Sequence, residues 1–266
     1  MWWAQADVME QVHLALPGAS ITPTWAWDES TGKGVRVAVI DSGINANHRS
    51  LGGRIAGYVS ISRGADGLLY DERPHGDPVG HGTACAGIIR RIAPDCELYS
   101  VRVVGPDRLG YCDVLAAGLA WAIEHGMQVC NLSLGTTRAE TAWRLRDLTD
   151  EAYFRNMMLV AAADNHGNHG FPWTYPSVIS VAAHPTQDPY VFYTNPEPPV
   201  EFGAPGIDVP IPLLAGWGSG TGNSYAAPHL AGLVTRILAK HPRLTVPEMK
   251  VVLRALSANA AAGAAA

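Results

Sequence analysis

The sequence lacks long hydrophobic runs and clusters of one charge. No segment approaches the roughly 18 consecutive apolar residues of a membrane-spanning helix, so no membrane partner is expected. Charged residues make up only 16% of the chain, the net charge is −5, and the Lys and Arg residues are scattered. Phosphate backbones are bound by clustered basic residues, so nucleic acid is not an expected partner either. Hydrophobic residues reach 47%, which is a globular composition.

Cysteine is scarce as well. The chain has four, Cys85, Cys96, Cys112 and Cys130, with no CxxC pair. This number and spacing favour free thiols over a disulfide framework. The first twenty residues also lack the basic start and unbroken apolar core of a signal peptide. Both observations predict a cytoplasmic protein.

Strand-like and helix-like segments alternate along the chain. Apolar, β-branched runs predict strands at 34–40, 96–104, 127–135, 157–165, 177–184 and 201–209. Helical periodicity predicts helices at 113–126, 140–156, 226–241 and 246–256, the first capped by Asp113 and ended by Gly126. This alternation predicts an α/β fold, a mostly parallel sheet with helices on both faces. We expect an N-terminal lead-in (1–24), one domain (25–257) and a disordered Ala-rich tail (258–266).

Several polar residues occupy positions where such sheets bind ligands. Asp41 and Asn165 end predicted strands, and Ser224 follows a Gly-rich segment at the start of a helix, where backbone N–H groups favour negative charge. His81, in GHG, also begins a helix. A serine nucleophile needs a base, an acid that orients the base, and oxyanion donors. Taken singly, each has another interpretation: a turn residue, a structural histidine or a helix cap.

Five segments, taken together in chain order, favour the catalytic interpretation of these residues. They are GVRVAVIDSGINANHRSL, GHGTACAGI, VCNLSLG, VAAADNHG and GTGNSYAAPHLAG, and they resemble the signature blocks of the subtilisin-like serine proteases. The resemblance covers about residues 25–240 and implies a subtilisin-like fold and a serine endopeptidase without a cofactor. It implies that Ser224 is the nucleophile, His81 the general base, Asp41 its orienting acid and Asn165 an oxyanion donor.

The resemblance also places the substrate, an extended peptide or protein segment. Ser133, Leu134 and Gly135 match the segment that pairs with the substrate backbone and walls the S1 pocket, and Ala163 and Asp164 precede the oxyanion residue. Asp164 stands where the family usually has glycine. Either it attracts a basic side chain at P1, the residue before the cleaved bond, or it points outward in a left-handed turn.

Other features set this chain apart from its relatives. The run GIIRRIAPDCELYSV leaves no room for the calcium-binding loop of many members, so that site is expected to be absent, with a weaker calcium site left open. No HExxH or paired Cys/His spacing predicts another metal. His48 and His229 are expected to be structural. Cys85, one helical turn after His81, is either a small buried residue or a thiol beneath the histidine, as in proteinase K-like members, whose activity can be thiol-sensitive.

Two classes of function remain open. The first is an active endopeptidase, either for general peptide turnover or for one precursor in ribosomal peptide maturation; the compact chain favours precursor processing. The alternative is a catalytically idle homologue that serves as a peptide-binding module. An α/β-hydrolase esterase is excluded, because the serine context lacks the second glycine of the nucleophile elbow and the order of the triad differs.

Overall fold

The computed structural model describes residues 21–107, 110–214 and 216–260. Along the chain the elements are α2 (Pro23–Ala26), β1 (Arg36–Asp41), β2 (Gly57–Gly64), β3 (Gly67–Asp71), α3 (His81–Ile92), β4 (Glu97–Arg102), α4 (Cys112–Glu124), β5 (Val129–Leu132), α5 (Ala139–Phe154), β6 (Met158–Ala162), β7 (Ile179–His184), β8 (Tyr193–Thr194), β9 (Phe202–Pro205), β10 (Val209–Pro212), β11 (Trp217–Gly220), α6 (Asn223–Lys240) and α7 (Val246–Leu256).

A nine-stranded sheet forms the centre of the molecule, in the order β3-β2-β4-β1-β5-β6-β7-β9-β8. The seven inner strands pair in parallel, while β3 and β8 run antiparallel at the two edges. Along β1, Val37 and Val39 face one hydrophobic core and Ala38 and Ile40 the other. Successive side chains of a strand point to opposite faces, so both faces must be covered.

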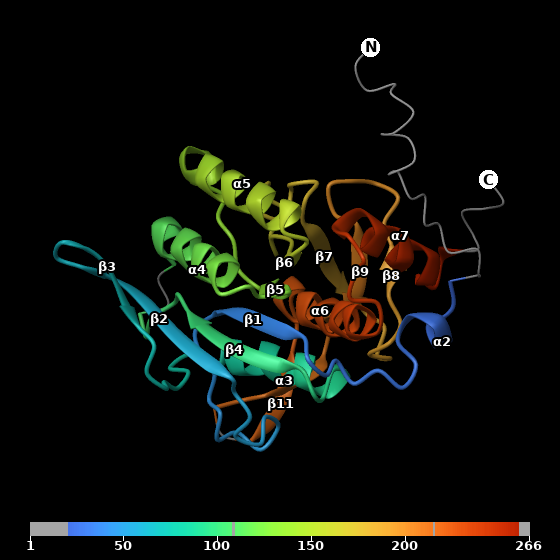
Figure 1. Ribbon diagram of the computed structural model, residues 1–266, viewed down its shortest axis with the longest axis horizontal. Coiled ribbons are helices and arrows are strands. Elements are labelled where there is room, and N and C mark those ends of the chain that lie inside the picture. The colour runs from blue at the N-terminus through green and yellow to red at the C-terminus, as the bar shows by residue number, and fades with distance from the viewer. Residues whose placement is uncertain (1–20, 108–109, 215, 261–266) are drawn as a thin grey trace, which may run out of the picture.

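Helices cover both faces. The core that contains Val37 and Val39 is filled by side chains of α3, α6 and α7, and the other core by side chains of α4 and α5. Figure 1 shows α4 and α5 on one side of β1 and β4, with α3 on the other. The predicted α/β class, a mostly parallel sheet between helices, is confirmed.

Some local expectations were wrong. Asp113 does not cap α4: the cap position is Tyr111, and the Asp113 carboxylate in the first turn accepts a hydrogen bond of 2.7 Å from Arg63. The predicted strand 201–209 is divided, because β9 pairs with β7 in the main sheet and β10 pairs with β11 in a separate two-stranded sheet. The helix expected at 226–241 begins three residues earlier, so Ser224 lies in its first turn.

The expected ends of the domain also shift. The position 24/25 falls inside α2, whose cap is the Thr22 side chain. At the other end, Ala258 donates its N–H to Phe192 O at 2.8 Å, and the Asn259 side chain bonds both the N–H and the carbonyl of Thr194. The expected disordered tail is therefore wrong for 258–260. Residues 1–20 and 261–266, where the rest of the lead-in and tail fall, lie outside the described residues.

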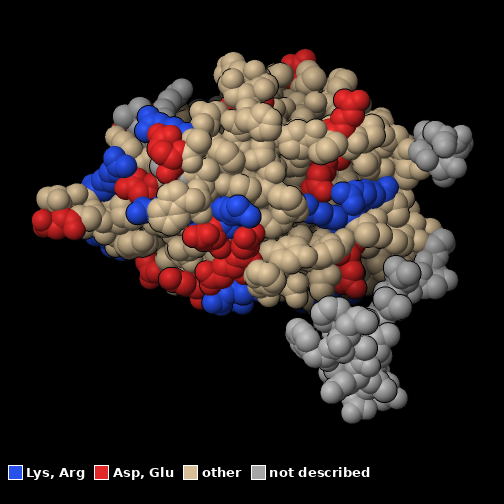
Figure 2. All heavy atoms as spheres, turned by 90° about the horizontal axis from the view of Figure 1, so that it is seen from above, with Lys and Arg blue, Asp and Glu red and all other residues tan. Residues whose placement is uncertain are grey.

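The surface and the cysteines agree with the composition. On the face in Figure 2, basic and acidic side chains are interspersed among larger neutral areas. Among the described residues, no helix combines the length and apolar character needed to span a bilayer. The four cysteines are free, as predicted.

Candidate active site

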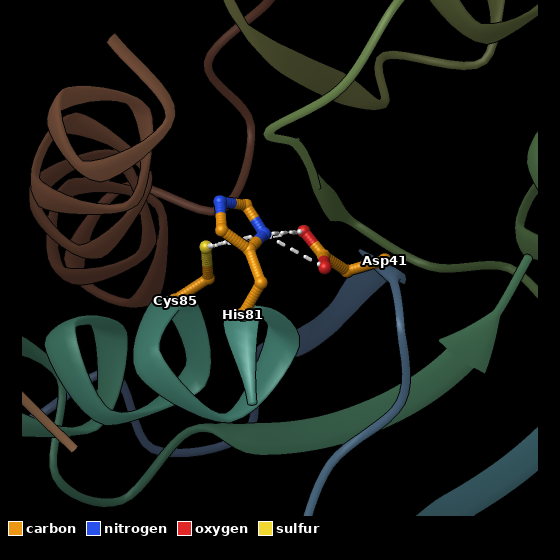
Figure 3. Close-up of side chains that lie close together, drawn as sticks. All are labelled: Asp41, His81 and Cys85. Atoms are coloured by element: carbon orange, nitrogen blue, oxygen red, sulfur yellow. Dashed lines mark hydrogen bonds and ion pairs between the residues drawn. The ribbon is translucent and has the colours of Figure 1, made fainter. Parts of the chain in front are cut away.

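Asp41 and His81 form the most tightly connected pair of the site. Asp41 ends β1 with its side chain 2% exposed, and His81 is the first residue of α3. Both carboxylate oxygens of Asp41 lie 2.9 Å from His81 Nδ1, as Figure 3 shows. The carboxylate raises the pKa of His81 above its usual value, although burial acts in the opposite direction. Nδ1 therefore carries the proton shared with Asp41, and Nε2 is the basic atom.

Asp77, which the sequence analysis missed, fixes the start of α3. Its Oδ1 accepts hydrogen bonds from Gly80 N–H and Ser42 Oγ, both 2.8 Å, and its Oδ2 accepts from Thr83 N–H at 2.8 Å. A carboxylate at a helix N-terminus satisfies free N–H groups and complements the helix dipole. Asp77 thus holds the turn that presents His81. An acidic residue just ahead of GHG was the available signal.

Ser224 is held by its own carbonyl as well as by α6. Pro228 has no N–H, so the i−4 carbonyl, that of Ser224, loses its helical partner. Ser133 Oγ donates to this carbonyl at 2.7 Å, and Cys85 Sγ lies 3.5 Å from it. The predicted substrate segment and the predicted nucleophile are therefore joined directly.

Ser224 Oγ and the predicted oxyanion residue both lie next to Gly222. A Cβ built on Gly222 would lie 3.4 Å from Ser224 Oγ and 3.7 Å from Asn165 Nδ2, so both atoms border the same small space. Within the part of the chain that the structure describes, Ser224 Oγ forms no hydrogen bond to His81. In unliganded enzymes such bonds are often long and tighten only with substrate.

Asn165 and Asn223 orient each other. Asn165 Oδ1 accepts the N–H of Asn223 at 2.8 Å, which leaves Asn165 Nδ2 as the atom that can donate to an oxyanion. Asn223 Nδ2 donates to Ala163 O and Asp164 O, at 3.1 and 3.0 Å, and its Oδ1 accepts Ala183 N–H at 2.8 Å. Asn223 thus ties the first turn of α6 to the end of β6 and to β7. Its role was not predicted, because nothing local in the sequence reveals these partners.

A hollow of about 460 Å³ adjoins Ser224. All the predicted substrate residues line it together with the oxyanion residue, namely Ser133, Leu134, Gly135, Ala163, Asp164 and Asn165. Residues that the sequence analysis did not single out line it too, among them Arg138, Gly170 and Trp173. The volume is in the range of specific ligand sites and accommodates one large side chain.

Asp164 is bound into its own loop. Its Oδ1 accepts hydrogen bonds from the N–H groups of His166 and Asn168, at 2.8 and 3.1 Å, and from Asn168 Nδ2 at 3.0 Å. Burial raises the pKa of Asp164, but these hydrogen bonds outweigh it and the net shift is downward. The left-handed turn, one of the two alternatives for Asp164, is not observed: the described non-glycine residues with positive φ are Glu29, Asn156 and Asp208.

Both histidines expected to be structural have structural partners. His229 is 1% exposed, with Nδ1 2.8 Å from Tyr225 O and Nε2 3.0 Å from Arg91 Nη2. Burial lowers the pKa of His229 to about 4, so it is neutral. The buried His48 bonds Ser50 Oγ through Nδ1 and Gly216 O through Nε2, which ties its loop to the β10–β11 hairpin.

Cys85 lies beside the Asp41–His81 pair. The fully buried Sγ is 4.0 Å from His81 Nδ1 and 3.9 Å from Asp41 Oδ2 (Figure 3), and burial raises the pKa of the thiol. The three side chains each offer one ligand atom, all within 4.8 Å of one another. A thiophilic ion bound by these three atoms would compete with the Asp41–His81 hydrogen bond.

The parallel sheet and this constellation define a subtilisin-like protein, and the chain belongs to the subtilase family: the model described as "Subtilase family" matches residues 32–265. The chain is 33% identical over 236 residues to Subtilisin E of Bacillus subtilis (strain 168), covering 83% of this chain and 59% of that protein. It is also 33% identical to Subtilisin of Bacillus pumilus, covering 83% of this chain and 82% of the relative.

Solved structures agree with this assignment. The S41 psychrophilic protease superposes with a TM-score of 0.71 and 26% sequence identity, over 84% of this chain and 82% of that one. A cold-adapted subtilisin-like serine proteinase superposes with a TM-score of 0.66, at 25% identity and the same coverage. The predicted family is therefore confirmed, while the chain spans only about three-fifths, 59%, of the length of Subtilisin E.

Proposed function

We propose that this chain is a serine endopeptidase that hydrolyses peptide bonds through an acyl-enzyme. The observation that carries the proposal is the double contact of Asp41 with His81 Nδ1, 2.9 Å to each oxygen. This contact fixes the imidazole in the tautomer whose Nε2 can accept a proton. The hollow beside Ser224 supplies the space for a peptide side chain.

The residues divide the reaction between them. Ser224 Oγ attacks the carbonyl carbon of the substrate while His81 Nε2 takes its proton. Asn165 Nδ2 and the N–H groups at the start of α6 receive the charge that develops on the carbonyl oxygen. His81 then gives the proton to the leaving amine. Water, deprotonated by His81, releases the acyl group and restores Ser224.

Main-chain hydrogen bonds to Ser133–Gly135 would hold the substrate as an added strand. These residues follow β5 and line the hollow, with Thr136 joined to Phe171 by a β-bridge behind them. The Ser133 side chain is already used, since it bonds Ser224 O at 2.7 Å. Substrate pairing therefore depends on the backbone of this segment.

A fluorophosphonate probe tests the proposal. We expect the probe to form an adduct at Ser224, located by peptide mass spectrometry, with none in Ser224→Ala and much less in His81→Ala. Folding of each variant is checked by circular dichroism. An unlabelled wild-type protein that is folded, with and without calcium, would instead favour the catalytically idle, peptide-binding homologue.

We propose further that the enzyme processes a defined precursor peptide in a reducing, cytoplasmic environment. The four free cysteines support a reducing compartment, because disulfides are rare in the cytoplasm. A substrate cleft that extends beyond the first hollow, described below, supports recognition of a long segment. Digestion of a proteome-derived peptide library should yield few cleavage sites that share an extended motif, whereas broad cleavage would indicate general turnover. Fractionation of the native cells should recover the protein with cytoplasmic markers.

A further inference from the structure

Two further hollows continue the substrate hollow along α4 and α5. The nearer one, about 290 Å³, shares Leu134 and Gly135 with the substrate hollow. The farther one, about 630 Å³, shares Tyr111 and Cys112 with the nearer one and reaches Trp143 of α5. Arg138 lines all three. We call the farthest the outer hollow; neighbouring hollows share lining residues, so the three lie next to one another in a row.

The hollows lie on the acyl side of the cleavage point. His81 must reach the leaving amine, so the C-terminal half of a substrate departs on the His81 side. The residues lining the three hollows do not include His81. A substrate paired with Ser133–Gly135 would therefore lead its N-terminal portion past Tyr111 towards the outer hollow.

Aromatic rings wall the outer hollow. Trp143 is 59% exposed and Tyr111 is 37% exposed, although both are large apolar side chains. Rigid exposed aromatic rings at the margin of a cleft are typical of sites that bind another chain. The hollow therefore offers apolar contact to a passing peptide.

The charge available in the outer hollow is positive. Arg63 is neutralised by Asp113, with contacts of 2.7 and 3.0 Å, and stacks on Tyr111 with its guanidinium carbon 4.0 Å from the ring centroid. Arg144 lies over the Trp143 ring at 5.3 Å and forms no ion pair with any residue that the structure describes.

Glu140 is the remaining acidic residue of the outer hollow. It lies in the first turn of α5, where the helix N-terminus offsets part of its charge. The lining as a whole contains three arginines against two carboxylates.

We propose that the outer hollow is an extended subsite for the substrate segment that begins at P5, the fifth residue before the cleaved bond. Trp143 packs on that segment and Arg144 selects a carboxylate within it. This inference rests on the proposed peptidase function and goes beyond it by naming a substrate class: peptides with an acidic segment upstream of the cleavage site. Charge complementarity and continuity with the cleft carry it.

Binding to Ser224→Ala, which cannot form an acyl-enzyme, tests the subsite separately from catalysis. Fluorescent peptides would share P4–P2′ and carry either Glu or Gln at P5, P6 and P7, with fluorescence anisotropy as the readout. We expect the best Glu peptide to bind about three- to fivefold more tightly than its Gln counterpart, the ratio of a part-exposed ion pair, and the ratio to fall with added salt.

The variants make the test specific. Arg144→Glu in the Ser224→Ala background should invert the Glu/Gln ratio, and Trp143→Ala should weaken both extended peptides. Arg146→Glu is the matched control, because Arg146 is an exposed residue of the same helix outside the hollow, and it should preserve the ratio. Equal binding of Glu and Gln peptides, or equal effects of Arg144→Glu and Arg146→Glu, would overturn the subsite. If the Glu peptide binds more tightly but the wild-type protein hydrolyses no peptide, the proposed subsite is supported and the proposed peptidase function is contradicted.

Discussion

At the scale of single residues, charge around His81 determines when the site can react. Asp41 is almost completely buried and contacts Nδ1 through both oxygens. Low exposure strengthens this interaction, because solvent screens it little. Neutral His81 is the base, so any group that stabilises its protonated form moves activity to higher pH.

The acid limb of the pH–rate profile should therefore lie above 6.5, the usual pKa of histidine, because Asp41 raises the pKa of His81. In Asp41→Asn the main cause of that raised pKa is lost while burial still lowers the pKa, so the limb should move to lower pH. At the same time kcat should fall by about 10⁴-fold, because the tautomer is no longer fixed. The dependence of kcat/KM on pH for a short peptide checks this, and a limb that moves upward in Asp41→Asn would contradict it.

Asp164 and Arg138 bring opposite charges to the substrate hollow. We expect Asp164→Asn to reduce the preference for Lys or Arg over Gln at P1 by about two- to fivefold, the range of part-exposed ion pairs. Asparagine keeps the oxygen that accepts three hydrogen bonds from the loop, so stability should be preserved. Asp164→Ala is the comparison variant, because it loses both the negative charge and the oxygen that accepts the hydrogen bonds of the loop. A P1 peptide library unchanged by Asp164→Asn would assign this side chain to the loop alone.

At the scale of elements, the site is a junction of strand ends with two helix starts. Asp77 holds the start of α3 and Asn223 holds the start of α6. Ser133, after β5, bonds the carbonyl that Pro228 leaves free. The contacts of Asn223 and Ser133 join elements that are distant in sequence, so the geometry of the reacting atoms depends on the packing of the whole sheet.

Asn223 is predicted to act through Asn165. Asn223→Ala removes the bonds to Ala163 O and Asp164 O, and kcat should fall by about tenfold with little change in KM. Asn165→Ala should cost about 10²- to 10³-fold in kcat. In Asn165→Ala the Nδ2 donor is absent, so Asn223 has no donor left to position. The double variant Asn165→Ala/Asn223→Ala should therefore have the same kcat as Asn165→Ala. Additive losses in this double-mutant cycle would show an independent role for Asn223.

Hydrophobic pattern predicted the buried elements and motif order predicted the residues of the site. β1 and β6 are buried along nearly their whole length, which gave a clear signal. The exposed β2–β3 hairpin was missed, because its alternation is weak and Tyr70 is 54% exposed. The contacts of Asn223 could not be predicted, since hydrogen bonding across the fold leaves no periodic trace in the sequence.

At the scale of the whole molecule, a short connection joins α3 to β4. Four residues, 93–96, connect α3 to β4. In this turn the buried Arg90 guanidinium donates to Pro94 O and Cys96 O, both at 2.8 Å, and to Arg54 O at 2.7 Å. A cation belonging to the chain thus occupies carbonyl oxygens of the kind that calcium also binds.

Stability should accordingly be independent of calcium. A ligand that binds only the folded state stabilises it by an amount that grows with the logarithm of its concentration relative to Kd. Without a calcium site, chelation with EDTA should therefore shift Tm by less than about 1 °C. Arg90→Met should lower Tm clearly, because the carbonyls of Pro94, Cys96 and Arg54 lose their donor. Differential scanning calorimetry with EDTA and with added calcium checks both. A large fall in Tm on chelation would reveal the weaker calcium site that the sequence left open.

The four cysteines, described above for their redox state, also differ in accessibility. Cys85, Cys96 and Cys130 are buried, whereas Cys112 is half-exposed and borders both hollows beyond the substrate hollow. The natural sequence therefore carries one addressable thiol, and that thiol sits where a bound peptide would pass. A fluorophore attached at Cys112 would report peptide binding in the cleft without any substitution in the protein, because its fluorescence intensity would change when a peptide binds or dissociates.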